Sequence, residues 1–189
     1  MAAQEPPCEV HGLGNKGMRR KITVFIVIFV CFLLQTTLFQ ALAFASIAPN
    51  LLIIVVSSFG FMRGRKEGMY IGFFTGLVFD AFYGTIFGFY ALVFMYAGYC
   101  NGMFRKFFFP DDIKLPMLLI SVSDIVYNIA VYVLKFMFRG QFHLGYYLLH
   151  VIIPELVYTV LIMIFLYPVL LTINQKLEAI EKRSGIKFV

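Results

Sequence analysis

Several apolar runs in this chain are long enough to cross a lipid bilayer, and they restrict the possible folds more than any other feature. A membrane helix needs about 20 apolar residues to span the hydrocarbon layer. Residues 22–44 and 146–173 both reach that length. With 61% apolar and only 14% charged residues, the chain also lacks the charge that a soluble protein of 189 residues needs on its surface. We therefore expect an all-α integral membrane protein with one compact domain.

Six apolar segments are the predicted membrane helices. They cover residues 22–44, 50–62, 67–83, 86–104, 115–138 and 146–173 and make a transmembrane domain from residue 18 to residue 176. Residues 1–17 are polar and predict a disordered N-terminal tail, and residues 177–189 form a charged C-terminal tail. A cleaved signal peptide is the alternative for the first span, although its apolar run exceeds the roughly 7–15 residues of such segments.

Basic residues are divided unequally between the two sides of the predicted bundle. Fourteen of the sixteen Lys and Arg residues fall on the side that holds both termini, and only Lys135 and Arg139 fall on the other. Positive charge accumulates on the cytoplasmic side of membrane proteins, so we expect both termini in the cytoplasm. The net charge of +6 then reflects contact with anionic headgroups, and nucleic acid is not expected as a partner.

A ladder of small residues with a period of four runs through the third predicted span and the turn after it. Its members are Gly68, Gly72, Gly76, Asp80, Gly84 and Gly88. Residues four apart share one face of a helix, so this glycine ladder predicts a nearly bare backbone groove with one carboxylate. Such grooves let membrane helices approach closely. The pattern favours a helix pair packed within the protein, and docking of a partner helix or a small molecule is the alternative.

The glycine ladder follows the short second span, which Pro49 opens, and a basic turn. This turn consists of Arg63, Gly64, Arg65 and Lys66. On the cytoplasmic side we expect it to contact lipid headgroups, with cytoplasmic filaments as the alternative partner.

Polar residues also occur inside the fifth and sixth predicted spans. One face of the fifth span carries Ser121, Asp124, Asn128, Tyr132 and Lys135. Ionisable groups are costly in hydrocarbon, so we expect this face to meet other helices and the Asp124–Asn128 pair to hydrogen-bond with them. Glu155 directly follows Pro154, and this proline predicts a bend in the sixth span. Lys135 of the fifth span is within reach of Glu155. A proton relay and a substrate pocket are the alternatives to this structural role.

Motifs of soluble enzymes are missing from the sequence. It contains no Gly-rich phosphate loop followed by Lys and Ser or Thr, and no His-Glu-x-x-His pair. Cys8, Cys31 and Cys100 are scattered and have the spacing of neither a disulfide framework nor a metal site. We expect a protein without enzymatic activity, cofactor or metal.

The central part of the chain resembles the MreD family, the small membrane proteins of the bacterial rod-shape system. The resemblance rests on residues 49–53, the turn 63–68, the segment 72–80 and the two glycines that follow it, and it extends over about residues 18–176. The family-like positions are Pro49, Gly76, Asp80, Gly84 and Gly88. Asn50 stands where many members have Asp, and residues 1–17 have no counterpart.

The resemblance implies a non-enzymatic scaffold of the cell-elongation complex in the bacterial cytoplasmic membrane. Members of the family associate with the bitopic protein MreC, and through it with a glycan polymerase and a class B penicillin-binding protein. Filaments of the actin-like MreB lie on the cytoplasmic side. The family is also similar in architecture to the substrate-binding subunits of energy-coupling-factor vitamin transporters. Such a subunit is the alternative function, with Ala41 and Ala45 as its small-residue contact.

Overall fold

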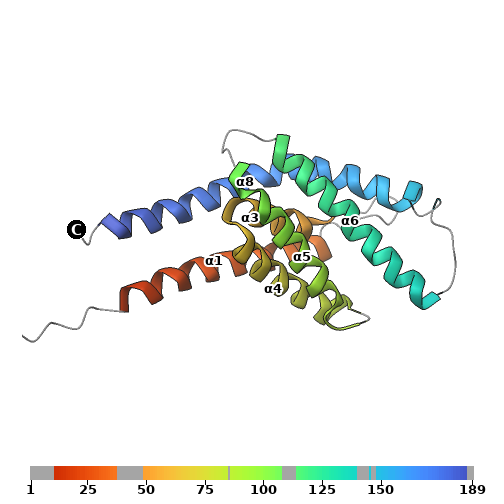
Figure 1. The fold of residues 1–189 in the computed structure, drawn as a ribbon, viewed down its shortest axis with the longest axis horizontal. Helices are drawn as coiled ribbons and strands as arrows, with labels where there is room; N and C mark the ends of the chain where they lie inside the picture. The colour runs from red at the N-terminus through yellow and green to blue at the C-terminus, as the bar shows by residue number, and fades with distance from the viewer. Residues whose placement is uncertain are drawn as a thin grey trace, which may run out of the picture.

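The computed structural model describes residues 11–37, 49–84, 86–107, 114–139, 145 and 148–186, and every regular element in these ranges is helical. In chain order the elements are α1 (His11–Thr36), α3 (Leu51–Arg63), α4 (Arg65–Tyr83), α5 (Phe89–Met103), η2 (Phe104–Phe107), α6 (Lys114–Arg139), η3 (Leu148–Ile152) and α8 (Ile153–Ile186). Figure 1 shows them as a bundle in which the short α3 lies centrally.

Helix α3 forms the centre of the bundle. All thirteen of its residues are buried, and it contacts α1, α4, α5, α6 and α8. At a rise of 1.5 Å per residue it is ~20 Å long, which is shorter than the ~30 Å hydrocarbon layer. Apart from Ser57, Ser58 and the terminal Arg63 its sequence is apolar, so it has no polar face to turn outward. This composition is typical of a helix that is enclosed on all sides.

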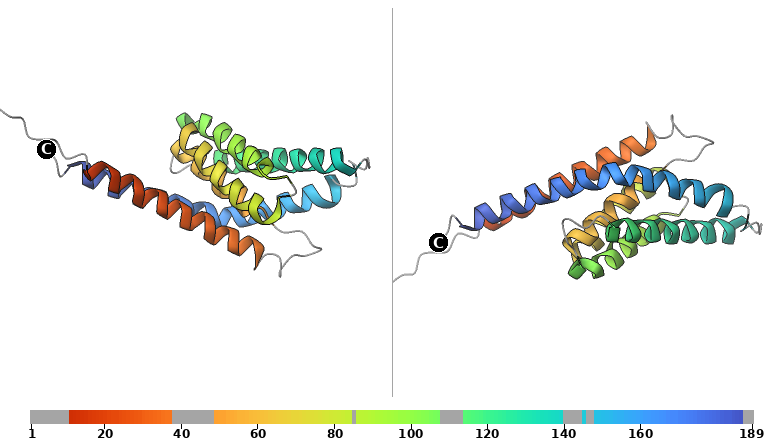
Figure 2. Two further views of the ribbon diagram at one scale, coloured as in Figure 1. Left: turned by 90° about the horizontal axis from the view of Figure 1, so that it is seen from below. Right: turned by 90° about the horizontal axis from the view of Figure 1, so that it is seen from above.

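Helices α1 and α8 project from the bundle in the same direction. Figures 1 and 2 show the beginning of α1 and the end of α8 extending beyond the other helices on one side. Helix α1 contacts α3 and α4, whereas α8 contacts α3 and α6. The C-terminal end of α3 and the N-terminal end of α4 lie on the side from which α1 and α8 project. Arg63 at the end of α3 contacts α8, and Glu67 at the start of α4 contacts α1.

The outer faces of the helices carry many large apolar side chains. Examples are Phe25 on α1, Val126 on α6 and Phe165 on α8, which are 53%, 58% and 77% exposed. Apolar patches of this extent mark surfaces that contact lipid or other proteins. Two of the described helical segments, Lys114–Leu134 and Leu148–Ile180, are long and apolar enough to cross a membrane.

The helix boundaries agree with the sequence in the middle of the chain and differ at its ends. The second, third and fifth predicted spans coincide with α3, α4 and α6 to within two residues. Helix α1 already begins at His11, within the predicted tail 1–17, and α8 continues to Ile186 through most of the predicted tail 177–189. Helix α5 begins at Phe89, three residues later than predicted.

A π-helical turn precedes Pro154, the residue at which the sequence predicts a bend. The five residues Leu148–Ile152 form a π-helical turn, and α8 begins directly after it. A proline has no amide proton for the helical ladder, and a widened turn is one of the ways in which a helix accommodates it. A second proline, Pro168, lies inside α8.

Candidate functional site

The glycine ladder is the contact surface between α4 and α5. A Cβ at Gly68 would collide with the carbonyl oxygen of Gly98, and a Cβ at Gly76 would collide with the backbone of Ala91. Gly72 lies against the carbonyl of Phe94 in the same way. The backbones of the two helices therefore touch along three turns. In the structure α4 and α5 form a helix pair packed within the protein, and α5 fills the groove that was the alternative site for a small molecule or a partner helix.

Helix α3 joins this contact through one further glycine. A Cβ at Gly60 would lie 2.6 Å from the carbonyl oxygen of Gly98, and a Cβ at Gly68 would lie 2.7 Å from the Cα of Gly60. Three helices thus cross at Gly60, Gly68 and Gly98. Sequence reasoning missed Gly60, although Gly60 and Gly64 continue the ladder's period of four toward the N-terminus, because Gly60 lies in the preceding span before the basic turn.

The last two members of the ladder lie in the turn between α4 and α5. Gly84 is the C-cap of α4, and its amide donates to the carbonyl of Asp80. Gly88 is the N-cap of α5 and has a φ of 98°, a left-handed conformation that glycine adopts without strain. Both residues therefore serve the turn and not the helix groove.

Asp80 joins the same two helices. Its carboxylate accepts hydrogen bonds from the backbone amides of Gly88 at 3.1 Å, Tyr90 at 3.2 Å and Ala91 at 2.9 Å. These amides belong to the first turn of α5, where the helix dipole favours a negative charge. Asp80 is buried, so its oxygens are already occupied within the protein. The carboxylate predicted to lie in the groove is a helix cap.

Polar side chains from three helices surround the N-terminus of α3. The side chain of Asn50 accepts from the amide of Ile53, and Gln35 of α1 accepts from the amide of Leu52 at 3.1 Å. The amide of Asn50 donates to the hydroxyl of Thr159 on α8 at 3.2 Å. Helix amides at membrane depth need such partners. Pro49 is buried beside this group. Asn is one of the favoured N-cap residues, which accounts for Asn50 at the start of α3.

Asp124 contributes to the same group from α6. Its side chain is fully buried and directed at Thr159 and Asn50, although neither carboxylate oxygen makes a hydrogen bond of good geometry. Asn128 is also buried, but its amide donates to the backbone carbonyl of Asp124 in its own helix. The structure thus places Asp124 against other helices as predicted, whereas the hydrogen bond of Asn128 stays within α6. We call Gln35, Asn50, Asp124 and Thr159 the α3 N-terminal cluster.

A further polar contact lies halfway along α3. The side chain of Asn101 on α5 donates to the hydroxyl of Ser123 on α6 at 2.7 Å and to that of Ser57 on α3 at 3.2 Å. Polar side chains of this kind link helices inside membranes. The sequence contains no pattern that would pair these three residues.

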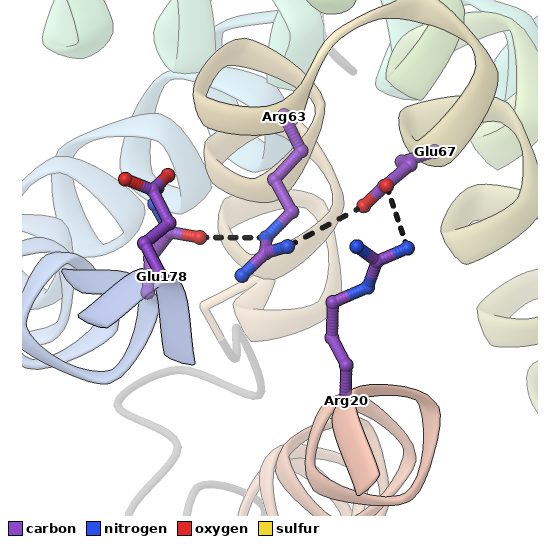
Figure 3. A network of polar contacts seen from close by, with 5 residues as sticks. Arg20, Arg63, Glu67 and Glu178 are labelled. Atoms are coloured by element: carbon purple, nitrogen blue, oxygen red, sulfur yellow. Dashed lines mark hydrogen bonds and ion pairs between the residues drawn. The ribbon is translucent and has the colours of Figure 1, made fainter. Parts of the chain in front are cut away.

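The other end of α3 carries a buried cation. Arg63 donates through Nε to Asn174 of α8 at 2.6 Å, and Asn174 in turn donates to Glu178. Glu67 of α4 lies 3.8 Å from Arg63 and forms a 2.7 Å ion pair with Arg20 of α1. This Arg63 network connects four helices, as Figure 3 shows. Arg63 was expected to contact lipid headgroups with the rest of the basic turn, but its side chain is only 5% exposed and is held inside the bundle, whereas Arg65 and Lys66 are exposed.

The remaining predicted residues are Glu155, Lys135, Ala41 and Ala45. Glu155 is half-buried at the start of α8, and its carbonyl accepts from Thr159. The side chain of Lys135 and the pair Ala41 and Ala45 lie outside the described part of the chain. Within that part, no group of three or more His, Cys, Asp or Glu residues has the arrangement of a metal site.

Comparison with known protein families gives a match over most of the chain. Residues 18–177 match the family described as rod shape-determining protein MreD. Comparisons with curated proteins and with solved structures give no match. The matched range contains the glycine ladder, the α3 N-terminal cluster and all of the Arg63 network except Glu178. The chain therefore belongs to the MreD family of rod shape-determining proteins.

Proposed function

We propose that this protein is a non-enzymatic scaffold of the cell-elongation complex. In this role it crosses the bacterial cytoplasmic membrane six times with both termini in the cytoplasm, binds an MreC-like bitopic protein and links peptidoglycan synthesis to MreB filaments. The glycan polymerase and the class B penicillin-binding protein of that complex are further partners, directly or through the MreC-like protein. The family match carries the proposal, because it assigns the chain to the proteins that determine rod shape.

The packing of the bundle supports a scaffold with a fixed shape. The glycines of α4 and α5 are in backbone contact, and the helices around α3 are joined by hydrogen bonds at both of its ends. Such a bundle offers partners one constant outer surface. Since α5 covers the glycine ladder, a partner helix has to dock on the outward faces, where large apolar side chains of α1, α6 and α8 are exposed.

Packing against these faces is sufficient for a single membrane helix. Association in lipid depends on close side-chain packing and on occasional hydrogen bonds, so it does not require a soluble interface. The proposal therefore predicts that an MreC-like partner remains bound after its extracytoplasmic part has been removed.

A depletion strain tests the proposal. The chain, carrying a C-terminal affinity tag, is expressed in a rod-shaped bacterium from which the native family member is depleted. We expect rod shape to return and an MreC-like protein to co-purify from membranes solubilised in mild detergent. A Gly98→Leu variant, which forces α4 and α5 apart, serves as the control and is expected to lose both effects.

Two results would contradict the proposal. One is a correctly inserted, monodisperse protein that restores no rod shape and retains no MreC-like partner. The other is retention of a vitamin-sized ligand in native mass spectrometry together with solute uptake into vesicles, which would establish the transporter subunit instead.

A further inference from the structure

Four exposed basic residues gather at the end of the bundle from which α1 and α8 project. Arg65 and Lys66 begin α4, and Arg105 and Lys106 lie in η2 after α5. All four side chains are exposed. They are about forty positions apart in the sequence, and we call them the basic patch.

Two glycines bring these segments together. The aliphatic stem of Arg105 packs on Gly64, where a Cβ would lie 2.9 Å from its Cδ. The N-terminus of α4 packs on Gly102, where a Cβ would lie 2.5 Å from the amide nitrogen of Arg65. Gly64 itself has a φ of 99°, so the tight turn before α4 favours glycine. The basic patch is thus a consequence of the tight packing of the start of α4 against the end of α5 and against η2.

The charge of the basic patch is not compensated within the described residues. None of its four members has an ion pair there, because the nearby acid Glu67 already contacts Arg20 and Arg63. The helix dipole makes the N-terminus of a helix partly positive, which repels cations and attracts anions. Arg65 and Lys66 lie in the first turn of α4, so their charges add to this positive potential. An anion that binds here is attracted by all four charges.

Apolar side chains directly border these charges. Lys66, Tyr70 and Phe74 are four residues apart on one face of α4, and Tyr70 and Phe74 are 59% and 54% exposed. Phe104 and Phe107, which flank the two cations of η2, are exposed as well. The surface therefore changes within one or two helical turns from cationic to apolar. A phospholipid has the same order of parts, an anionic phosphate followed by hydrocarbon.

We propose that the basic patch is a binding site for an anionic phospholipid. Its phosphate contacts Arg65, Lys66, Arg105 and Lys106, and an acyl chain lies along Tyr70 and Phe74 of α4. A soluble acidic protein or a nucleic acid would match the charges alone and would leave the aromatic stripe uncovered. The site holds one lipid in a defined place, which differs from the general attraction of a basic protein to an anionic leaflet.

Two pairs of substitutions of the same kind test this site. Lys66→Gln with Lys106→Gln removes two charges from the basic patch and preserves the packing of Arg105 on Gly64. Lys21→Gln with Lys176→Gln removes two exposed charges from α1 and α8 at the same end of the bundle. The full-length proteins are purified in non-ionic detergent. Their binding of phosphatidylglycerol, with phosphatidylcholine as reference, is followed by native mass spectrometry and by thermal unfolding.

We expect the wild-type protein to retain phosphatidylglycerol in preference to phosphatidylcholine and to be stabilised by it. The basic-patch pair should bind phosphatidylglycerol roughly 30-fold more weakly, which corresponds to ~1 kcal/mol for each lysine near a membrane surface. The Lys21 and Lys176 pair should bind it like the wild type. Thermal unfolding without lipid verifies that both pairs remain folded.

Three outcomes would overturn the proposal. An equal loss of binding in both pairs would show that net charge alone attracts the lipid. Unchanged binding in the basic-patch pair would place the lipid elsewhere. Stabilisation by inorganic phosphate to the same extent as by phosphatidylglycerol would show that the patch recognises free phosphate without the acyl chain.

Discussion

Gly68 and Gly98 face each other across the α4–α5 crossing so closely that a Cβ on either residue would overlap the carbonyl oxygen of the other. No side chain separates the two backbones at this point. Membrane helices gain stability from such approaches because close van der Waals contact replaces the hydrophobic effect as the driving force. The contact therefore determines how far apart α4 and α5 lie along their length.

Gly98→Ala is expected to destabilise the protein by ~1–3 kcal/mol, because the helices must separate to accommodate the methyl group. For a chain of this size this corresponds to roughly 2–4 °C of Tm per kcal/mol. Thermal unfolding in detergent measures the effect. Gly145→Ala is the matched control, since nothing lies within 4 Å of a Cβ there. Equal Tm values for the two variants would contradict the backbone contact.

Asp80→Ala should loosen the start of α5, since three backbone amides lose their acceptor. Loss of a helix cap costs about 0.5–2 kcal/mol, and we expect the upper end because Asp80 is buried. Asp80→Asn keeps one acceptor oxygen and should fall between the wild type and Asp80→Ala. Hydrogen exchange of the Tyr90 and Ala91 amides is the direct measurement. Unchanged protection in Asp80→Ala would show that these amides have other partners.

The members of the Arg63 network should differ in their response to salt. Asn174→Leu removes a buried hydrogen bond to a charged group and should cost ~1.5–3 kcal/mol at any ionic strength. Arg20→Gln removes a partly exposed ion pair and should cost at most ~1 kcal/mol, with the loss disappearing at molar salt. Denaturant unfolding at low and high salt separates the two cases. A large, salt-independent cost for Arg20→Gln would contradict this order.

In the α3 N-terminal cluster, Asp124→Asn should leave folding and cell shape nearly unchanged, because an amide of the same shape still meets Asn50 and Thr159. Thr159→Val should be harmful, because it leaves the buried amide of Asn50 without its acceptor, at a cost of ~1–3 kcal/mol. Unfolding and rescue of a depletion strain report both effects. Complete loss of folding and rod shape in Asp124→Asn would refute this role.

The proposed six-span topology predicts which positions a membrane-impermeant maleimide can reach. Cys8, Cys31 and Cys100 are first replaced by Ser, and single cysteines are then introduced. Lys66→Cys and Lys106→Cys should react only after the cells have been permeabilised, whereas Gly145→Cys should react in intact cells. Labelling of Lys66→Cys in intact cells would reverse the proposed orientation.

Local sequence patterns predicted the central elements well. The apolar run after Pro49 gave α3 to within one residue at each end, and the period of four gave the helix face that packs in α4. Both features are properties of one segment, so they can be read without knowledge of the neighbours. The beginning of α5 was misplaced because Ile86 and Phe87 continue the apolar pattern. The left-handed Gly88 and the carboxylate of Asp80 determine where this helix starts.

Contacts between distant segments were not predictable in the same way. Arg63 is one of three neighbouring basic residues, and only the position of Asn174, more than one hundred residues later, turns it inward. Asn101, Ser57 and Ser123 likewise have no shared motif. The sequence also did not determine which helix packs on the glycine ladder, because a bare helix face packs equally well on a helix of its own chain and on another protein.

The complete enclosure of α3 affects how the chain can be inserted into the bilayer during synthesis. A segment with the serines Ser57 and Ser58 and the buried cation Arg63 would meet lipid on several sides until the later helices have been made. Helix α8 supplies the acceptors for Asn50 and Arg63 and is translated last. The nascent protein therefore reaches its final arrangement only after its C-terminal helix has left the ribosome, because α8 supplies the last partners of both ends of α3.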